Sequence, residues 1–220
     1  MSSEILRIVE SIPSCAKCSR LTDWCQVVAA NPPKRFAGQQ YWAKPVPPLG
    51  DPKAEFLIVG LAPAAHGANR TGRMFTGDRS GDWLFRALHK AGVCNQPHSL
   101  DIDDGLTISN ALIVATCHCA PPENKPTTEE IRNCNLWLSG VVKAKAWRGI
   151  LCLGGIAWTE THRVFRVTPP KFGHGVASIV DSTRIVASYH PSQQNTFTGR
   201  LTEPMLDAAV QRWLMGQEQT

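Results

Sequence analysis

The sequence lacks a long apolar run and lacks a segment that resembles a secretory signal. Its first ten residues, MSSEILRIVE, mix acidic and apolar positions and have no basic n-region. No apolar run approaches the ~18 residues that a membrane-spanning helix needs. We therefore expect a cytoplasmic protein with no membrane partner. Internal repeats, low-complexity tracts and long linkers are also missing, so we expect residues 1–220 to form a single domain and to act as a monomer.

Two common nucleotide-binding motifs are missing from a loop that would suit them. Residues 60–78, GLAPAAHGANRTGRMFTGD, place four glycines, two arginines and an aspartate directly after an apolar run. Glycines let a backbone approach a phosphate closely, with free N–H groups pointing at it. However, the loop contains neither GxGxxG nor GxxxxGK[ST]. It therefore needs another explanation than a dinucleotide or P-loop site.

The charge balance gives a first indication of the partner. The chain has 23 basic and 18 acidic side chains, a formal net charge of +5. This modest surplus is compatible with a polyanion such as nucleic acid, although many basic proteins bind no polyanion. Arg70, Arg73 and Arg79 gather around the glycine-rich loop and strengthen the nucleic-acid hypothesis.

The distribution of apolar residues predicts an α/β fold. Short apolar runs at 56–60, 106–117, 150–154 and 184–189 predict four buried strands, and helical patterns at 80–92, 127–147, 155–165 and 203–216 alternate with them. Thr127 stands three residues before Glu130, the spacing of a capping box. Strands that are apolar throughout are typical of a parallel sheet covered on both faces. We expect a three-layer α/β/α domain with a mainly parallel four-stranded sheet, and a ligand site beyond the carboxyl ends of its strands.

Eight cysteines are many for a chain in a reducing compartment, where disulfides are disfavoured. Cys15 and Cys18 form a CxxC, Cys119 follows the second predicted strand, and Cys134 lies in the next helix. Four thiolates suit zinc or an iron-sulfur centre equally well, so the spacing does not choose the metal. Cys117 could replace Cys119 as a ligand, and Cys134 could be a core residue. We expect core positions for the remaining cysteines, Cys25, Cys94 and Cys152.

The motifs GLAPA, GANRTGR…FTGD, CAPPENKP and HPS, in this order, resemble the uracil-DNA glycosylase superfamily, and most closely its family 5, the type B enzymes of bacteria and archaea. The resemblance covers most of the chain, from the first CxxC to the HPS segment and beyond. It implies hydrolysis of the bond between uracil and deoxyribose in DNA, which leaves an abasic site for base excision repair. It also implies a [4Fe-4S] cluster, which fits Cys15, Cys18, Cys119 and Cys134 and would tie the N-terminal segment to the domain.

The resemblance gives the glycine-rich loop a task, because a glycosylase must extrude a nucleotide from the duplex and enclose it. Phe75 could stack on the base, and Arg70 and Arg73 would face phosphates. The base would lie against a tight wall of backbone formed by Gly60, Leu61, Ala62, Pro63 and Ala64.

Cleavage of the bond produces an oxocarbenium-like sugar and a departing base anion, so the site must stabilise both charges and place a water. Asp78 is our candidate for orienting the water, with a helix N-cap as the alternative. His190 follows the last predicted parallel strand and could donate a hydrogen bond to the uracil oxyanion, although a strand-end histidine could also only satisfy backbone groups. Asn124 resembles the family residue that contacts the base or the water, but asparagine after prolines is also an ordinary turn former.

The segment after His190 is expected to enter the minor groove, with Gln193 and Gln194 near the vacated base position and Arg200 on a phosphate. The alternative is a solvated polar loop. For His66 and His174 a structural role is favoured over a place in the pocket.

The short motif GLAPA departs from other families of the superfamily, which place a carboxylate or asparagine there. This departure predicts relaxed base discrimination, with hypoxanthine or other deaminated bases as further substrates. Two rival interpretations remain: a non-catalytic nucleic-acid-binding protein with a structural iron-sulfur cluster, and a zinc-dependent nucleotide hydrolase.

Overall fold

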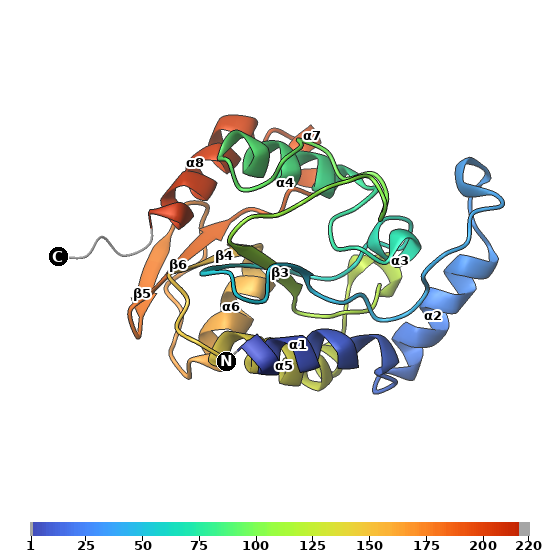
Figure 1. The fold of residues 1–220 in the computed structure, drawn as a ribbon, viewed down its shortest axis with the longest axis horizontal. Coiled ribbons are helices and arrows are strands. Elements are labelled where there is room, and N and C mark those ends of the chain that lie inside the picture. Colours follow the sequence, from blue (N-terminus) through green and yellow to red (C-terminus); the bar gives the residue numbers. More distant parts are fainter. Residues whose placement is uncertain (1, 216–220) are drawn as a thin grey trace.

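A computed structural model describes residues 2–215 of the chain. Its centre is one six-stranded sheet with the order β1-β3-β2-β4-β6-β5. The four inner strands run parallel to one another and correspond to the four strands predicted from the sequence. They are β2 (Phe56–Gly60), β3 (Ala111–Ala115), β4 (Gly149–Leu153) and β6 (Thr183–Ser188). The expected α/β fold is confirmed, since helices cover both sides of a mostly parallel sheet (Figure 1).

The predicted number of strands was wrong, because two antiparallel strands extend the edges. β1 (Leu49–Gly50) pairs with β3, and β5 (Ala177–Val180) pairs with β6. β1 has two residues in a proline-rich segment, and the residues of β5 are only partly buried. Neither segment shows the continuous apolar run that marks a fully buried strand, so the pattern that identified the inner strands could not identify these two.

Two helical layers enclose the sheet. α4 (Arg79–Lys90) and α8 (Glu203–Leu214) pack on one face, and the other face is covered by α1 (Ser2–Ser11), α5 (Thr128–Lys143) and α6 (Gly155–Val164) (Figure 1). Alternate residues of β2 supply the two cores: Ile58 packs in the cluster under α4 and α8, whereas Leu57 packs in the cluster under α5 and α6. The three-layer arrangement therefore follows from strands that are apolar on both faces.

Helix ends agree with the local sequence signals. The side chain of Thr127 accepts a hydrogen bond from the backbone N–H of Glu130, and the Glu130 carboxylate accepts one from the Thr127 N–H, which completes the predicted capping box. The helix predicted over 80–92 begins one residue earlier, at Arg79, because Asp78 is its N-cap. The helix predicted over 203–216 ends at Leu214, and residue 216 lies outside the described residues.

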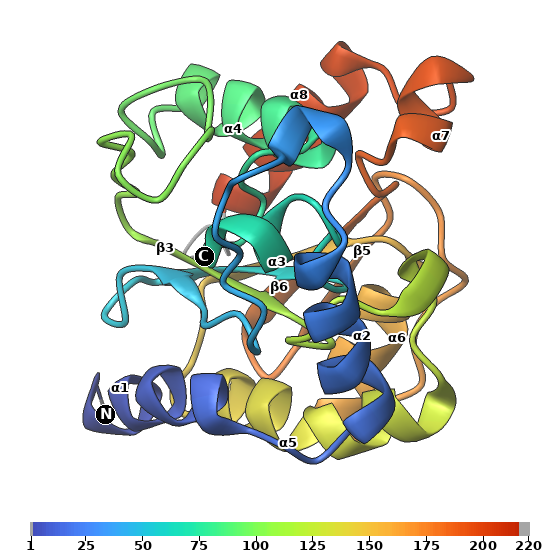
Figure 2. The same ribbon diagram turned by 90° about the vertical axis from the view of Figure 1, so that its right-hand side faces the viewer.

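An N-terminal arm lies beside the carboxyl ends of the parallel strands. It comprises the 3-10 helix η1 (Ile12–Ser14), α2 (Ser19–Ala30) and the 3-10 turn η2 (Lys34–Phe36). The loop after β2, which contains the short helix α3 (Ala68–Thr71), lies near α2 in both views (Figures 1 and 2). In the part of the chain that the structure describes, no helix is both long and apolar enough to cross a membrane.

Candidate functional site

The glycine-rich loop begins where β2 ends, and the backbone of the neighbouring segment holds it there. The N–H and the hydroxyl of Thr116 both donate to the Gly60 carbonyl at 2.9 Å, and the Cys117 N–H donates to the Leu61 carbonyl at 2.8 Å. A Cβ atom on Gly60 would lie 2.9 Å from Cζ of Phe75. Gly60 is therefore needed for the aromatic ring to lie directly against the end of the strand.

The segment after β6 brings His190 to the same edge of the sheet. The ring of Phe75 lies near that of His190, with centroids 6.1 Å apart and an interplanar angle of 29°. A cavity of about 260 Å³ opens beside His190. This volume is close to the lower end of the ~300–1,000 Å³ typical of small-molecule pockets. Its lining includes Leu61, Gly154, Phe172, Tyr189, His190, Asn195 and Arg200.

The electrostatics of His190 favour a neutral imidazole. Burial lowers the pKa of His190 to about 4, well below the ordinary value of 6.5. The backbone around it is fixed, because the side-chain amide of Asn195 donates to the His190 carbonyl at 2.8 Å. At neutral pH the ring can therefore donate one hydrogen bond into the cavity without carrying a charge.

Asp78 is the N-cap of α4, the alternative role that the sequence analysis considered for it. Its carboxylate accepts a hydrogen bond from the Gly81 N–H at 3.1 Å and caps the N-terminus of α4. A Cβ atom on Gly67 would lie 2.1 Å from the Asp78 carboxylate, so the glycine lets the backbone of the loop touch it. Burial raises the pKa of Asp78 above its ordinary value, against the lowering effect of its backbone hydrogen bonds. Asp78 does not line the cavity beside His190.

Three other predicted residues lie at the surface. Asn124 is exposed at the end of the 3-10 turn η3 (Pro122–Asn124), with a left-handed φ of 57°. Gln193 and Gln194 are exposed in the first turn of α7 (Gln193–Phe197), which Ser192 caps. The structure therefore brings His190, Phe75 and the GLAPA backbone together, and leaves Asn124 and the two glutamines on exposed turns.

The arginines predicted to contact DNA differ in their exposure to solvent. Arg200 is exposed, lines the cavity and lies with its guanidinium 4.7 Å from the ring centroid of Tyr189. Arg70 is partly buried; it donates to the His66 carbonyl and to the Gln39 side chain.

The expectation that Arg73 faces a phosphate is wrong. Its side chain is 8% exposed and forms an ion pair with Asp104 at 2.6 Å. The guanidinium also donates to the side chains of Thr76 and Ser99 and to the Ile102 carbonyl. Arg73 therefore fastens the end of the glycine-rich loop to residues 99–104 and has no accessible face for DNA.

Both unassigned histidines have protein partners. Nδ1 of His66 lies 3.0 Å from the hydroxyl of Tyr41. Nε2 of His174 lies 3.1 Å from the Met205 carbonyl, and its Nδ1 accepts from the Tyr189 N–H at 3.3 Å. Burial lowers the pKa of both rings. These contacts agree with the structural roles favoured from the sequence.

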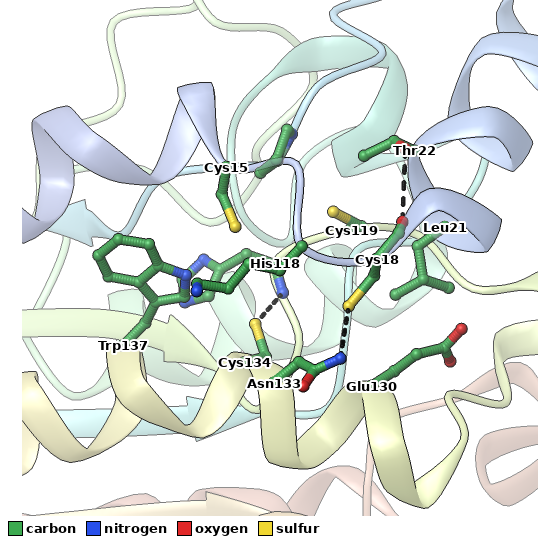
Figure 3. A pocket seen from close by; sticks show the side chains of 12 residues that line it. Cys15, Cys18, Leu21, Thr22, His118, Cys119, Glu130, Asn133, Cys134 and Trp137 are labelled. Carbon is green, nitrogen blue, oxygen red and sulfur yellow. Dashed lines mark hydrogen bonds between the residues drawn. The ribbon is translucent and has the colours of Figure 1, made fainter.

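The four cysteines predicted to bind the cluster line one hollow beside the N-terminal arm (Figure 3). Cys15 and Cys18 come from the turn between η1 and α2, Cys119 from the segment after β3, and Cys134 from α5. Two of the sulfurs accept hydrogen bonds: Cys18 from the Asn133 amide at 3.7 Å, and Cys134 from the His118 N–H at 3.4 Å. Hydrogen bonds to sulfur are a feature by which proteins tune thiolate-bound clusters.

The structure also distinguishes Cys119 from Cys117. β3 ends at Ala115, and the residues that follow bend instead of continuing the strand. Cys119 lines the hollow, whereas Cys117 is fully buried and does not line it, although the Cys117 thiol hydrogen-bonds to Cys134. Cys25, Cys94 and Cys152 are buried, as expected.

The donor set fits a thiolate-bound metal cluster. All eight cysteines are free of disulfides, and burial followed by the neighbouring thiols raises the pKa of Cys119. Such thiols ionise readily only beside a cation. Within residues 2–215, no three His, Cys, Asp or Glu side chains are arranged to hold a single metal ion. The thiols surround a hollow instead of converging on one point.

A bidentate ion pair holds α2 beside this hollow. Nε and Nη2 of Arg20 each donate to a different oxygen of the Glu130 carboxylate at 2.7 Å. Glu130 is the residue that closes the capping box of α5. The N-terminal arm is therefore attached to α5 by a direct ion pair.

Sequence reasoning missed part of the cavity wall. Gly154 and Gly155 directly follow the apolar run of β4, and this strand-to-glycine pattern could have marked them. Ser192 and Asn195 stand at the spacing of a helix N-cap and its N3 residue, a second usable signal. Phe172 and Tyr189 carry no local pattern that places them there.

Comparisons with known proteins agree with this arrangement. The family model described as the uracil DNA glycosylase superfamily matches residues 47–214. The type-5 uracil-DNA glycosylase of Mycobacterium leprae is 50% identical over 202 residues, which cover 89% of this chain and 88% of that protein. The type-5 enzymes of Thermus thermophilus and Pyrobaculum aerophilum are 44% and 43% identical, covering 90% and 93% of this chain and 91% and 89% of theirs. The chain belongs to the uracil DNA glycosylase superfamily, as the motifs of its loops indicated.

Proposed function

We propose that this protein is a uracil-DNA glycosylase of base excision repair, which hydrolyses the bond between uracil and deoxyribose and leaves an abasic site. The observation that carries the proposal is the meeting of Phe75 and His190 at the edge of the sheet, beside a cavity and against the Gly60 end of β2. Relatives of 43–50% identity named type-5 uracil-DNA glycosylases support it.

In the proposed reaction the glycosidic bond breaks, C1′ receives the hydroxyl of a water, and uracil leaves as an anion that takes up a proton. His190 donates a hydrogen bond to the developing uracil oxyanion. A neutral ring suits this task, since its lowered pKa keeps the imidazole uncharged and a neutral imidazole still carries one N–H donor. Phe75 stacks on the extruded base, and the backbone of residues 60–64 closes around it.

Asp78 stabilises the cationic sugar and accepts a proton of the attacking water in this proposal. Two observations support the role: the carboxylate lies against the backbone of Gly67 in the same loop, and burial raises its pKa, which makes it a stronger base. Serving also as the cap of α4 fixes the orientation of the carboxylate. We propose three further kinds of contact. The base or the water is contacted by Asn124, and the vacated base position by Gln193 and Gln194. The phosphates are contacted by Arg70 and Arg200.

The substrate range is proposed to extend beyond uracil. The segment beside Gly60 has no polar side chain, because it consists of Leu61, Ala62, Pro63 and Ala64. A base other than uracil would therefore leave no side chain of this segment without its hydrogen-bond partner. Hypoxanthine is therefore a proposed second substrate. Incubation with matched oligonucleotides that carry uracil or hypoxanthine, followed by a count of abasic sites, tests this breadth.

A [4Fe-4S] cluster is the proposed resident of the cysteine hollow. Cys15, Cys18, Cys119 and Cys134 would hold it, and when bound it would supply a cross-link between the N-terminal arm and the sheet. Iron and sulfide analysis of protein purified without oxygen, together with broad absorbance near ~400 nm, distinguishes it from zinc.

The decisive experiment is single-turnover release of uracil from an oligonucleotide by wild-type protein and by His190→Gln. We expect wild type to leave abasic sites and the variant to be slower by roughly 100-fold, the loss typical of an oxyanion donor. A protein that binds DNA but never releases a base would instead be the non-catalytic nucleic-acid-binding protein that the sequence left open. The monomeric state and the cytoplasm of a bacterium or archaeon stay predictions.

A further inference from the structure

A basic surface is shared by the N-terminal arm and Arg70 of the glycine-rich loop. Lys34 and Arg35 are exposed in η2, and Phe36 of the same turn is half-buried. The guanidiniums of Arg35 and Arg70 both lie against the ring of Phe36, with Cζ at 4.6 Å and 4.4 Å from its centroid. The aromatic ring therefore orders two cations from segments that are far apart in the sequence.

The two segments that build this surface contain no acidic side chain. No aspartate or glutamate occurs from residue 24 to residue 50, or from residue 56 to residue 77, the two segments that build it. Among the described residues, Lys34, Arg35 and Arg70 form no ion pair. After burial, the positive charges of Arg35 and Arg70 further lower the pKa of the neighbouring His66. The charge of this surface is thus left for an external anion.

The surface is fixed relative to the catalytic loop. The Trp42 N–H donates to the Arg70 carbonyl at 2.9 Å and the Ala43 N–H to the Asn69 carbonyl at 3.0 Å. Arg70 also donates to Gln39, and Tyr41 contacts His66. In Figure 1 the segment projects beyond the end of α2, on the side of α3.

We propose that Lys34, Arg35 and Arg70, ordered by Phe36, bind phosphates of the DNA strand next to the extruded nucleotide. The surface is separate from α7 and Arg200, which follow β6. This inference rests on the proposed glycosylase function for its ligand. It gives the N-terminal arm a part in substrate binding in addition to holding cysteines. Arginine recognises the phosphates of a nucleic-acid backbone through its planar fork, and two guanidiniums are ordered here on one ring.

The test compares two double variants that remove equal charge. Lys34→Gln/Arg35→Gln removes the surface, and Lys53→Gln/Lys143→Gln removes two exposed lysines at the opposite edge of the sheet, before β2 and β4. Affinity for a uracil-free duplex is measured over a series of salt concentrations. The plot of log K against log salt has a negative slope, and each lost phosphate contact makes this slope shallower by about 0.9.

We expect the slope of Lys34→Gln/Arg35→Gln to be shallower than the wild-type slope by about 2. The control variant should keep the wild-type slope. At saturating enzyme, the control variant should release uracil at the wild-type rate. Equal slopes for the two variants would overturn the inference. If wild-type protein releases no uracil, the proposed function fails, whereas the slopes still decide whether η2 contacts the backbone of DNA.

Discussion

The rings of Phe75 and His190 lie 6.1 Å apart between centroids and are inclined by 29°. This pair joins two loops that leave different strands, since Phe75 follows β2 and His190 follows β6. Neither side chain alone defines a site. Together they place a hydrogen-bond donor in the wall of the cavity, with the buried ring of Phe75 packed against the imidazole.

Phe75→Leu should slow uracil release by roughly 5- to 150-fold, because it removes a base-stacking contribution of about 1–3 kcal/mol. The leucine keeps an apolar side chain against Gly60. Single-turnover kinetics at saturating enzyme measure the effect. Phe56→Leu is the matched control, since Phe56 packs against Trp213 in the core; it should lower the melting temperature and leave the rate constant alone. A wild-type rate for Phe75→Leu would remove Phe75 from the pocket.

Asp78→Asn and Asp78→Ala separate catalysis from helix capping. Asparagine caps a helix about as well as aspartate, so Asp78→Asn should fold with nearly wild-type stability, whereas Asp78→Ala should lose about 1 kcal/mol. Both should slow uracil release by roughly 10²- to 10⁴-fold if the carboxylate is the general base. Urea denaturation and single-turnover kinetics are the two measurements. A fast Asp78→Asn enzyme would restrict Asp78 to its structural role.

The low pKa of His190 makes stability depend on pH. The folded protein binds this proton only near pH 4, whereas the unfolded chain binds it near pH 6.5. The unfolded state therefore holds more protons between these values, and stability should fall as the pH drops from about 6.5 to about 4. The contribution is at most about 3 kcal/mol.

Urea denaturation at pH 7.5 and pH 4.5 measures this contribution. His190→Gln should lose less stability than wild type over that interval. His89→Gln is the control, because His89 is exposed on α4; it should follow the wild-type curve. Parallel loss in wild type and His190→Gln would show that the ring is not desolvated.

Asp104→Asn should destabilise the loop that Arg73 fastens. Burial opposes the ionisation of Asp104, but the Arg73 bond and the N–H groups of Leu100 and Leu106 hold its pKa at about 2. The stabilisation is present above pH ~3.9 and is lost as the pH falls toward 2. Breaking a largely buried pair costs up to about 3–5 kcal/mol.

Thermal unfolding at pH 7 measures the effect of Asp104→Asn. Glu123→Gln is the control, because it removes an exposed pair with Lys125 and should change stability by less than about 1 kcal/mol. The salt dependence of DNA binding should be unchanged in Asp104→Asn. A reduced salt slope would instead return Arg73 to the DNA interface.

Cys119→Ala and Cys117→Ala test the choice between two neighbouring thiols. Cys119 lines the hollow and Cys117 does not, so only Cys119→Ala should lose iron and the visible absorbance. Both remove one buried sulfur, which matches their packing cost. Metal analysis after anaerobic purification provides the measurement, and loss of iron from Cys117→Ala alone would reverse the assignment.

The inner strands and α5 were predictable because their signals are local. Continuous apolar runs identify β2, β3, β4 and β6, and the capping box identifies α5. The edge strands β1 and β5 were missed because they lack such runs. Arg73 was misplaced for a different reason: its partner Asp104 lies 31 residues further along the chain, and no local pattern reports which of two neighbouring arginines turns inward.

The cavity wall shows the same limit. His190 was found from the strand it follows, but Phe172 and Tyr189 approach the cavity through tertiary packing alone. The bend after Ala115, which separates Cys117 from Cys119, is equally invisible to a rule that assumes a continuing strand.

The Glu130 carboxylate links two helices: it accepts a hydrogen bond from the Thr127 N–H at the start of α5 and two from the guanidinium of Arg20 on α2. Because the ion pair between Arg20 and Glu130 needs no metal, it holds α2 against α5 in the folded chain itself. The four thiols already lie around one hollow, so iron would bind to a preformed site and would not need to order the N-terminal arm. The Arg20–Glu130 pair would hold the arm to α5 with or without a bound metal.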